Sequence, residues 1–327
     1  MHIVLYPRVA PDVLDIAERL LPPGFALKMV DPSVGPAGLA AALAEADFLM
    51  GFIGPLPAEA WRAAKSLRLI QLLSAGYDNL QIDQARQLRI PAATNGGANA
   101  ISVAEHAVML MLALYRRLPQ FDRDVRQGKW RSAARGETRY HELGGKRVGL
   151  IGMGMIGRQV AKRLRGFDVD LWYYDVRRLA PEEEAQLGAT FAAFDDLISS
   201  VDVLSLHLPL LPETRGIIGE KELSAMRPGS VLINTARGEL VDEPALVKAL
   251  QAGPLAGAGL DVFAQEPPPA DHPLFSMENV VLTPHSAGPT WESWPRRFAN
   301  GYANVQRVAR GEKPQWVIPE LRDLLEG

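Results

Sequence analysis

A glycine-rich turn near the middle of the chain joins an apolar strand to a helix. Residues 146–151 (KRVGLI) have the short apolar run of a buried strand, and GMGMIG at residues 152–157 follows at once. In a G-x-G-x-x-G turn the first glycine permits the tight bend, the second lets a pyrophosphate approach the backbone, and the third allows the helix to pack on the strand. The helix that begins there offers N–H groups and a positive dipole to the phosphates. The turn therefore predicts an α/β domain that binds a dinucleotide.

An acidic residue follows the turn at the distance that a dinucleotide site requires. Asp175 ends the next predicted strand, 18 residues after Gly157, where its carboxylate can bind the adenine-ribose hydroxyls of NAD and repel a 2′-phosphate. Arg177 and Arg178 come next and would suit a 2′-phosphate, so NADP stays an alternative to NAD. Enzymes that bind S-adenosylmethionine also combine a glycine-rich turn with an acid, but the third glycine favours a dinucleotide.

Short apolar runs alternate with helical patterns along the rest of the chain, as in proteins with a parallel sheet. The 327 residues exceed the roughly 250–300 that one hydrophobic core usually holds, so we expect two domains. The polar segment 131–143 predicts a hinge or an exposed crossover. Strands are predicted at 3–6, 26–30, 48–52, 69–73, 146–151, 169–175, 201–208, 230–236, 255–262 and 280–285. Helices are predicted at 12–20, 37–46, 58–64, 99–118, 119–127, 156–165, 181–187 and 291–310.

Composition excludes several classes of function. The chain carries 35 basic and 38 acidic residues, and a net charge of −3 argues against nucleic acid or an anionic membrane as a main partner. It has no cysteine, which excludes disulfides, thiolate nucleophiles and thiolate-bound metals, and we predict no metal site. The longest apolar run, residues 107–115, is far shorter than the roughly 18 residues of a membrane span, so we expect a cytoplasmic protein.

Three segments in the C-terminal half carry side chains suited to catalysis. Arg237 follows a predicted buried strand and precedes a glycine, where a guanidinium can hold a carboxylate through two parallel hydrogen bonds. Glu266 precedes His285 by 19 residues, a separation that a loop and a strand can span to bring the carboxylate back to the imidazole. A carboxylate bound to an imidazole orients the ring for general acid–base catalysis near neutral pH.

Seven segments resemble, in their order and spacing, the D-isomer-specific 2-hydroxyacid dehydrogenase family, which includes glyoxylate and hydroxypyruvate reductases and phosphoglycerate dehydrogenases. They are SAGYDN (74–79), NGGANAISVAEHAVMLMLALYRR (95–117), GKRVGLIGMGMIG (145–157), LHLPLLPETRGII (206–218), MRPGSVLINTARGELVDEPALVKAL (226–250), GLDVFAQEP (259–267) and HPLFSMENVVLTPHSAG (272–288). The resemblance implies two Rossmann-like parallel-sheet domains, with an NAD-binding domain at 99–286 inserted into a discontinuous substrate domain at 1–98 and 287–327. Substrate and cofactor are then expected to meet between the domains.

The resemblance also implies a role for each site residue. His285 corresponds to the acid/base that exchanges the proton of the substrate 2-hydroxyl, Glu266 to its carboxylate partner, and Arg237 to the residue that binds the substrate carboxylate and polarises the 2-oxo group. The expected substrate-binding residues are Ser74, Ala75, Gly76 and Arg237. The expected cofactor-binding residues are Gly152, Gly154, Met155, Ile156, Gly157, Asp175, His207, Pro209, Thr214, Thr235, Ala236, Asp261 and His285.

Together these assignments predict an oxidoreductase that transfers a hydride between NAD(H) and a small D-2-hydroxy acid or its 2-oxo acid. Loop 50–55 and residues near Trp291 are expected to wall the substrate pocket. The long helix 99–118 is apolar on most faces and predicts a homodimer.

Two other functions stay open as alternatives. A phosphite dehydrogenase of the same superfamily would share this layout, whereas formate enzymes resemble it but carry Gln where Glu266 stands. An NAD-regulated, corepressor-like binding protein would retain a similar triad. Oxidation of phosphite with NAD, or binding of a peptide partner without turnover, would identify these functions.

Overall fold

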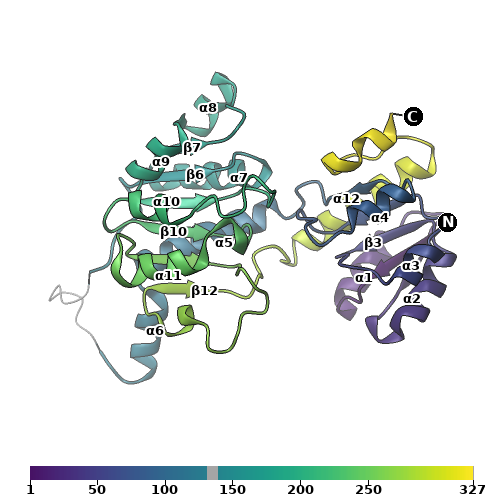
Figure 1. Cartoon of the computed structure of the whole chain (residues 1–327), viewed down its shortest axis with the longest axis horizontal. Helices are drawn as coiled ribbons and strands as arrows, with labels where there is room; N and C mark the ends of the chain where they lie inside the picture. The colour runs from purple at the N-terminus through teal and green to yellow at the C-terminus, as the bar shows by residue number, and fades with distance from the viewer. Residues whose placement is uncertain (131–138, 327) are drawn as a thin grey trace. The chain divides into compact units, whose positions relative to one another are not determined.

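The computed structural model describes residues 1–130 and 139–326, and the chain divides into two compact units. One unit combines Met1–Asn99 with Pro289–Gly327, and the other is Ala100–Gly288 (Figure 1). Each unit holds one parallel sheet with helices packed on it, which confirms the predicted α/β class with two parallel sheets. The hinge or crossover predicted at 131–143 falls mostly outside the described residues. Among the described helices, none combines the length and the hydropathy that a transmembrane segment needs.

The N-terminal segment forms a five-stranded sheet, and helix α12 (Ser293–Ala309) of the C-terminal segment packs in the same apolar core. The strand order of this sheet is β2-β1-β3-β4-β5, and all four pairings are parallel. In a doubly wound sheet of this order, ligands bind beyond the carboxyl ends of the strands, near the reversal of strand order between β1 and β3. The strands are β1 (His2–Tyr6), β2 (Ala26–Met29), β3 (Phe48–Gly51), β4 (Leu69–Leu72) and β5 (Ala92–Ala93). The helices are α1 (Pro11–Arg19), α2 (Gly35–Ala44), α3 (Ala58–Ala63), α4 (Ile82–Gln87) and α12 (Ser293–Ala309).

The middle of the chain forms a seven-stranded sheet in the order β12-β11-β10-β9-β6-β7-β8, again with parallel pairings only. This is the dinucleotide-binding order with one further strand, and its reversal lies between β6 and β9. The strands are β6 (Arg147–Ile151), β7 (Asp170–Tyr174), β8 (Ala189–Phe191), β9 (Val203–Leu206), β10 (Val231–Asn234), β11 (Gly257–Leu260) and β12 (Val280–Leu282). The helices are α5 (Ala100–Tyr115), α6 (Leu118–Arg126), α7 (Met155–Leu164), α8 (Pro181–Leu187), α9 (Phe194–Ser200), α10 (Glu220–Ala225) and α11 (Glu243–Ala252).

The strands of the larger sheet alternate their side chains between two apolar layers. Val148 and Leu150 of β6 pack in a layer with α5 and α7, whereas Ile151 packs in the opposite layer with α9, α10 and α11. A glycine stands where α5 lies close to the sheet, because a Cβ at Gly259 would come within 2.9 Å of the Leu110 side chain. Both faces of the sheet are therefore covered, and its carboxyl edge is the place for a ligand.

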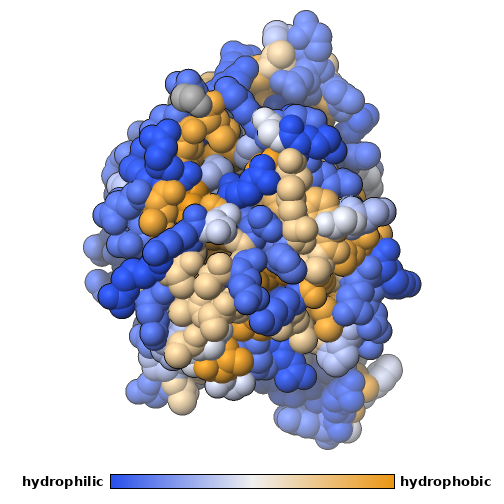
Figure 2. Space-filling view, turned by 90° about the vertical axis from the view of Figure 1, so that its right-hand side faces the viewer, coloured by the Kyte–Doolittle hydropathy of each residue, from blue (hydrophilic) through white to orange (hydrophobic). Residues whose placement is uncertain are grey.

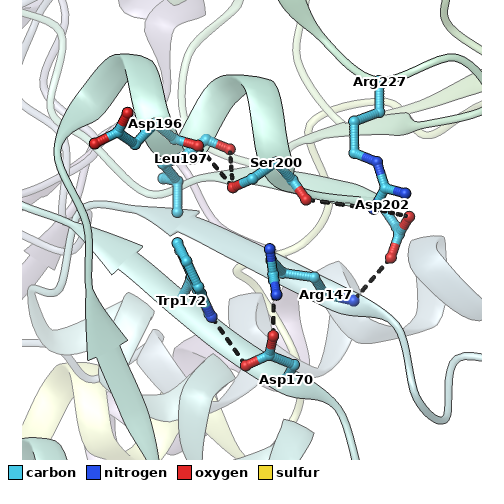
Figure 3. Close-up of polar contacts among 8 residues, drawn as sticks. All are labelled: Arg147, Asp170, Trp172, Asp196, Leu197, Ser200, Asp202 and Arg227. Carbon is cyan, nitrogen blue, oxygen red and sulfur yellow. Dashed lines mark hydrogen bonds and ion pairs between the residues drawn. The ribbon is translucent and has the colours of Figure 1, made fainter.

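A network of charged side chains holds the amino edge of the same sheet (Figure 3). Arg147 at the start of β6 forms an ion pair with Asp170 at the start of β7 across 2.7 Å, and its guanidinium lies 4.2 Å from the centroid of the Trp172 ring. Asp202 accepts a hydrogen bond from the Arg147 backbone N–H at 2.9 Å and pairs with Arg227 at 3.0 Å. These charges neutralise one another, and the residues predicted to be catalytic lie at the opposite edge.

The structure also contains elements that the sequence pattern did not predict. Strands β5 and β8 have two and three residues, too few for an alternating pattern to show. Helices α4, α9 and α10 have six or seven residues, about two turns each, which is too short for a helical pattern to stand out. The sequence pattern also does not predict the ten-residue helix α11. The predicted helix 99–118 is too long, because α5 ends at Tyr115 and Arg117 has a left-handed φ of 50° before α6 begins. The strands predicted at 201–208, 230–236 and 255–262 shorten to four residues each.

Candidate active site

The three predicted catalytic residues lie on consecutive loops at the carboxyl edge of the seven-stranded sheet. Arg237 follows β10, Glu266 follows β11 and His285 follows β12, and these strands are neighbours in the sheet. Parallel strands end at the same edge, so their loops gather where open α/β sheets bind ligands.

Glu266 and His285 form a hydrogen-bonded pair. The Nδ1 atom of His285 lies 2.6 Å from Oε2 of Glu266, and the second carboxylate oxygen accepts a hydrogen bond from the Phe263 backbone N–H at 3.0 Å. Because an ionised carboxylate only accepts, the proton of the neutral ring is on Nδ1. The His285 side chain is 48% exposed, so its Nε2 atom is the ring nitrogen left for a ligand.

A buried aspartate fixes the turn that carries His285. Asp261 is 1% exposed, and its carboxylate accepts hydrogen bonds from the backbone N–H groups of Ser286 and Ala287, each at 2.9 Å. The Thr283 hydroxyl also donates to this carboxylate, at 2.6 Å. These contacts hold His285 at a φ of 51°, a conformation that non-glycine residues rarely adopt. Asp261 is expected beside the cofactor, and in the structure its carboxylate supports the turn that carries His285.

His106 on α5 extends this support. Its Nε2 atom lies 2.9 Å from the Thr283 hydroxyl, which orients the hydroxyl toward Asp261. Burial lowers the pKa of His106, although the charge of Asp261 acts in the opposite direction, so the ring is neutral at neutral pH. The contacts of its Nε2 atom, with Thr283 and at 3.5 Å with Asp261, make His106 part of the support of the His285 turn.

The loop after β10 is shaped so that Arg237 stands next to the Glu266 loop. Asn234 fixes the turn, because its amide donates to the Arg237 carbonyl at 2.8 Å and its Oδ1 accepts from the Ala236 N–H at 3.0 Å. A Cβ at Gly238 would lie 1.9 Å from the Phe263 carbonyl carbon, so only glycine allows the two loops to come this close. Sequence reasoning missed Asn234, although an Asn at a strand end is a common turn signal.

The glycine-rich turn has the geometry that its sequence predicts. Gly152 has a φ of +98°, and a Cβ there would lie 2.6 Å from the His207 carbonyl oxygen. At Gly157 a Cβ would lie 2.1 Å from the Gly152 carbonyl oxygen, so helix α7 packs tightly on the turn. A Cβ at Gly154, in contrast, meets no heavy atom within 4 Å. The second glycine therefore faces open space at the N-terminus of α7, where a pyrophosphate fits.

The different surroundings of Gly154 and Gly157 lead to a testable contrast. Gly154→Ala should fold normally, because Gly154 has an ordinary φ of −71° and open space, but its methyl group should weaken NADH binding by roughly 10-fold or more. Gly157→Ala should lower the melting temperature because its methyl group overlaps backbone. Fluorescence titration with NADH and thermal denaturation measure both effects. Unchanged NADH affinity in a folded Gly154→Ala variant would contradict the assignment.

Asp175 lies at the end of β7 and also supports the glycine-rich turn. Its Oδ2 accepts a hydrogen bond from the Met153 N–H at 2.7 Å, and Oδ1 accepts one from the Arg177 N–H at 3.0 Å. Each oxygen of the Asp175 carboxylate can accept a further hydrogen bond, so the carboxylate can still bind the ribose hydroxyls of a cofactor. The Arg178 guanidinium is paired with the Glu184 carboxylate at 2.9 Å, so part of its charge is already neutralised within the chain.

Two buried polar atoms without partners fit a polar cofactor at this edge. Among the described residues, Nδ1 of His207 after β9 and the hydroxyl of Thr235 after β10 are buried and have no hydrogen-bond partner. Leaving such an atom unpaired costs about 1–3 kcal/mol, and a bound cofactor would remove that cost. Burial lowers the pKa of His207 to about 4, so its ring is neutral, and Ser205 is its partner at Nε2 across 3.0 Å.

The other residues predicted to bind the cofactor lie in loops and at the helix start along the same edge of the sheet. Thr214 shapes its own loop, because its hydroxyl donates to the Pro209 carbonyl at 2.8 Å and accepts from the Leu211 N–H at 2.8 Å. Met155 is exposed at the first turn of α7, next to Ile156. Ala236 follows Thr235 in the loop after β10.

The predicted carboxylate-binding turn lies in the other unit, after β4. The Ser74 hydroxyl donates to the Gly76 carbonyl at 2.7 Å, and the Ser74 carbonyl accepts from the Asn95 N–H at 2.9 Å. Among the described residues, the N–H groups of Ala75 and Gly76 donate no hydrogen bond. Successive free N–H groups in a turn form a concave site for an anion.

Comparisons with known proteins agree with this arrangement. Residues 108–287 match the family described as "D-isomer specific 2-hydroxyacid dehydrogenase, NAD binding domain". A glyoxylate reductase of Korarchaeum cryptofilum is 40% identical over 262 residues, which cover 80% of this chain and 78% of that protein. A D-3-phosphoglycerate dehydrogenase of Archaeoglobus fulgidus is 43% identical over 236 residues, 72% of this chain but 44% of the relative. A glyoxylate reductase structure from Paecilomyes thermophila superposes with a TM-score of 0.84 at 31% identity, covering 98% of this chain and 99% of the other.

The match to an NAD-binding domain model, over a sheet with the dinucleotide-binding strand order, shows that the chain is an NAD-dependent dehydrogenase. The matches to its sequence and fold are specific to one group of these enzymes. The chain belongs to the D-isomer-specific 2-hydroxyacid dehydrogenase family.

Proposed function

We propose that this protein reduces a small 2-oxo acid to the D-2-hydroxy acid with NADH, and catalyses the reverse oxidation, with His285 as general acid and base. The Glu266–His285 pair, 2.6 Å apart at the carboxyl edge, carries this proposal. The relatives named glyoxylate reductase make glyoxylate the first substrate to test. In this proposal Ala100–Gly288 binds the cofactor, and the unit that contains β1–β5 binds the substrate.

Each residue has a defined task in the reduction. Arg237 binds the substrate carboxylate and polarises the 2-oxo group, while the free N–H groups of Ala75 and Gly76 donate hydrogen bonds to the carboxylate. Bound NADH supplies the hydride that C2 receives. His285 donates the Nε2 proton to the 2-oxo oxygen, which becomes the hydroxyl, and Glu266 stabilises the charged imidazolium that does so.

A panel of 2-oxo acids tests the proposal directly. Glyoxylate, hydroxypyruvate and larger 2-oxo acids are offered with NADH or NADPH, and absorbance at about 340 nm reports cofactor oxidation. We expect turnover with at least one acid and a preference for NADH, since Asp175 disfavours a 2′-phosphate and Glu184 holds Arg178. Phosphite with NAD is the comparison reaction. Turnover of phosphite alone, or of no substrate, would overturn the proposal.

We also propose that two copies of the chain associate through α5 and α6. Figure 2 faces the side on which Figure 1 shows the unit with α1–α4 and α12, and hydrophilic residues and apolar areas alternate there, whereas α5 and α6 belong to the other unit. Large apolar side chains are exposed on α5 and α6, and Met109, Leu112, Leu118 and Phe167 border one apolar groove. Large exposed apolar surfaces mark interaction sites, and the apolar α5 was expected to pair with a second copy.

The mass in solution tests this association. Light scattering should give about 71 kDa, twice the chain mass of 35.7 kDa, and Met109→Lys should move the protein toward the monomer because it places a charge on the apolar face. Leu20→Lys is the matched control, since Leu20 is 40% exposed in the other unit. A monomeric wild-type protein at micromolar concentration would contradict the proposal.

A further inference from the structure

Arg297 on α12 is a buried cation that the steps above do not use. It is 2% exposed, and no ion pair among the described residues includes it. Burial, together with the charge of Arg296, lowers the pKa of Arg297 to about 10, which leaves the guanidinium charged at neutral pH. A buried charge without an opposite charge is costly, and an apolar residue of similar size would often be more stabilising there. Its presence therefore calls for a functional reason.

Two aromatic rings fix the guanidinium in place. Its carbon lies 5.6 Å from the Phe52 ring centroid and 5.4 Å from that of Trp294, and the two rings meet edge to face at 5.8 Å. Cation–π attraction offsets part of the desolvation cost and restricts the plane of the group. Phe52 is the residue after β3, within the loop expected to wall the substrate pocket. Arg297 is thus held rigidly beside that loop.

The guanidinium binds the peptide group at which the anion-binding turn begins. Nη1 of Arg297 donates a hydrogen bond to the Leu73 carbonyl, which also accepts one from the Asn95 side chain at 3.4 Å. The Leu73 carbonyl and the Ser74 N–H belong to the same peptide group. Donors on the carbonyl polarise that group and make its N–H a stronger donor. A positive charge therefore contacts the peptide group from which the turn at Ser74–Gly76 starts.

We propose that Arg297 positions the Ser74–Gly76 turn and supplies the charge with which this turn attracts the substrate carboxylate. The inference rests on the proposed function. It makes Arg297 a positioning residue that acts through Leu73, distinct from Arg237, which contacts the substrate itself. Bringing an anion to the turn gives the buried cation the opposite charge that it lacks in the chain alone.

Replacing Arg297 with neutral residues separates this role from packing. Arg297→Met keeps the length of the side chain and removes its charge, and Arg297→Gln keeps a donor for Leu73 without charge. We expect the KM for the 2-oxo acid to rise about 10-fold in the Met variant and less in the Gln variant, with kcat within about 3-fold and NADH affinity unchanged. Arg307→Met is the control, because Arg307 on the same helix also donates to a backbone carbonyl, that of Lys313.

Binding of oxamate, a non-reducible analogue, provides a second readout. Calorimetry on the NADH-loaded enzyme should show oxamate affinity falling in parallel with the rise in KM. Wild-type KM and oxamate affinity in either folded neutral variant would overturn the inference. So would a parallel loss of NADH affinity and thermal stability, which indicates damage to packing. If the wild type reduces no 2-oxo acid, the proposed function fails, and oxamate affinity still decides the role of Arg297.

Discussion

Replacing His285 with alanine should lower kcat by about 10³-fold and leave NADH affinity nearly unchanged. The loss follows from the geometry, because Nδ1 is bound to Glu266 and Nε2 is the nitrogen left to exchange a proton with the substrate. The side chain is half exposed, so its removal creates little cavity and should not unfold the chain. Turnover at saturating substrate, NADH titration by fluorescence and a melting curve measure the three quantities.

The chain contains a second Glu–His pair that serves as the control. His272 binds Glu243 across 2.8 Å with a side chain only 10% exposed, and its Nδ1 accepts a hydrogen bond from the Leu274 N–H. His272→Ala should therefore cost about 1–3 kcal/mol of stability and leave kcat within about 2-fold. Equal losses of kcat in the two variants, or an unimpaired His285→Ala enzyme, would contradict the assignment of the acid/base.

The elements that could be predicted are those with a strong local signal. The apolar strand before Gly152 and the long helix that starts near Ala100 could be predicted from the sequence. Their apolar runs are long enough, at five and sixteen residues, for a strand or helix pattern to show. Strand β8 has three residues and exists because β7 offers it a parallel partner. Pairing with a distant segment stabilises such a strand, and the local residue pattern does not indicate that pairing.

In the candidate site, too, the sequence predicts the features that depend on neighbouring residues and not those that depend on residues far apart in the chain. The sequence could place Arg237, Glu266 and His285 at strand ends, since each follows a recognisable strand. It could not show that Asp261 holds the His285 turn in a left-handed conformation, because that depends on three donors from residues 22–26 positions away. Nor could it single out Arg297, whose Leu73 contact spans 224 positions. Buried polar contacts of this kind become visible only with the fold.

Arg237→Lys should have the second-largest effect and should change both kinetic constants. Lysine keeps the positive charge but not the planar fork that can bind a carboxylate and face the 2-oxo oxygen at once. We expect KM to rise and kcat to fall by about 10-fold each, so that kcat/KM drops about 10²-fold, or about 2.7 kcal/mol of transition-state stabilisation. Initial rates over a range of 2-oxo acid at saturating NADH measure both constants.

The matched control for Arg237→Lys is Arg215→Lys. Arg215 pairs loosely with Glu239 across 3.7 Å and is 59% exposed, so the same substitution there should change the kinetics by less than about 2-fold. The pattern also separates the two arginines, because loss of Arg297 should raise KM while kcat stays nearly constant, whereas the Arg237 variant loses both. Wild-type kinetics in Arg237→Lys would show that no bidentate contact forms, and the carboxylate would then have to be bound by the Ser74–Gly76 turn without Arg237.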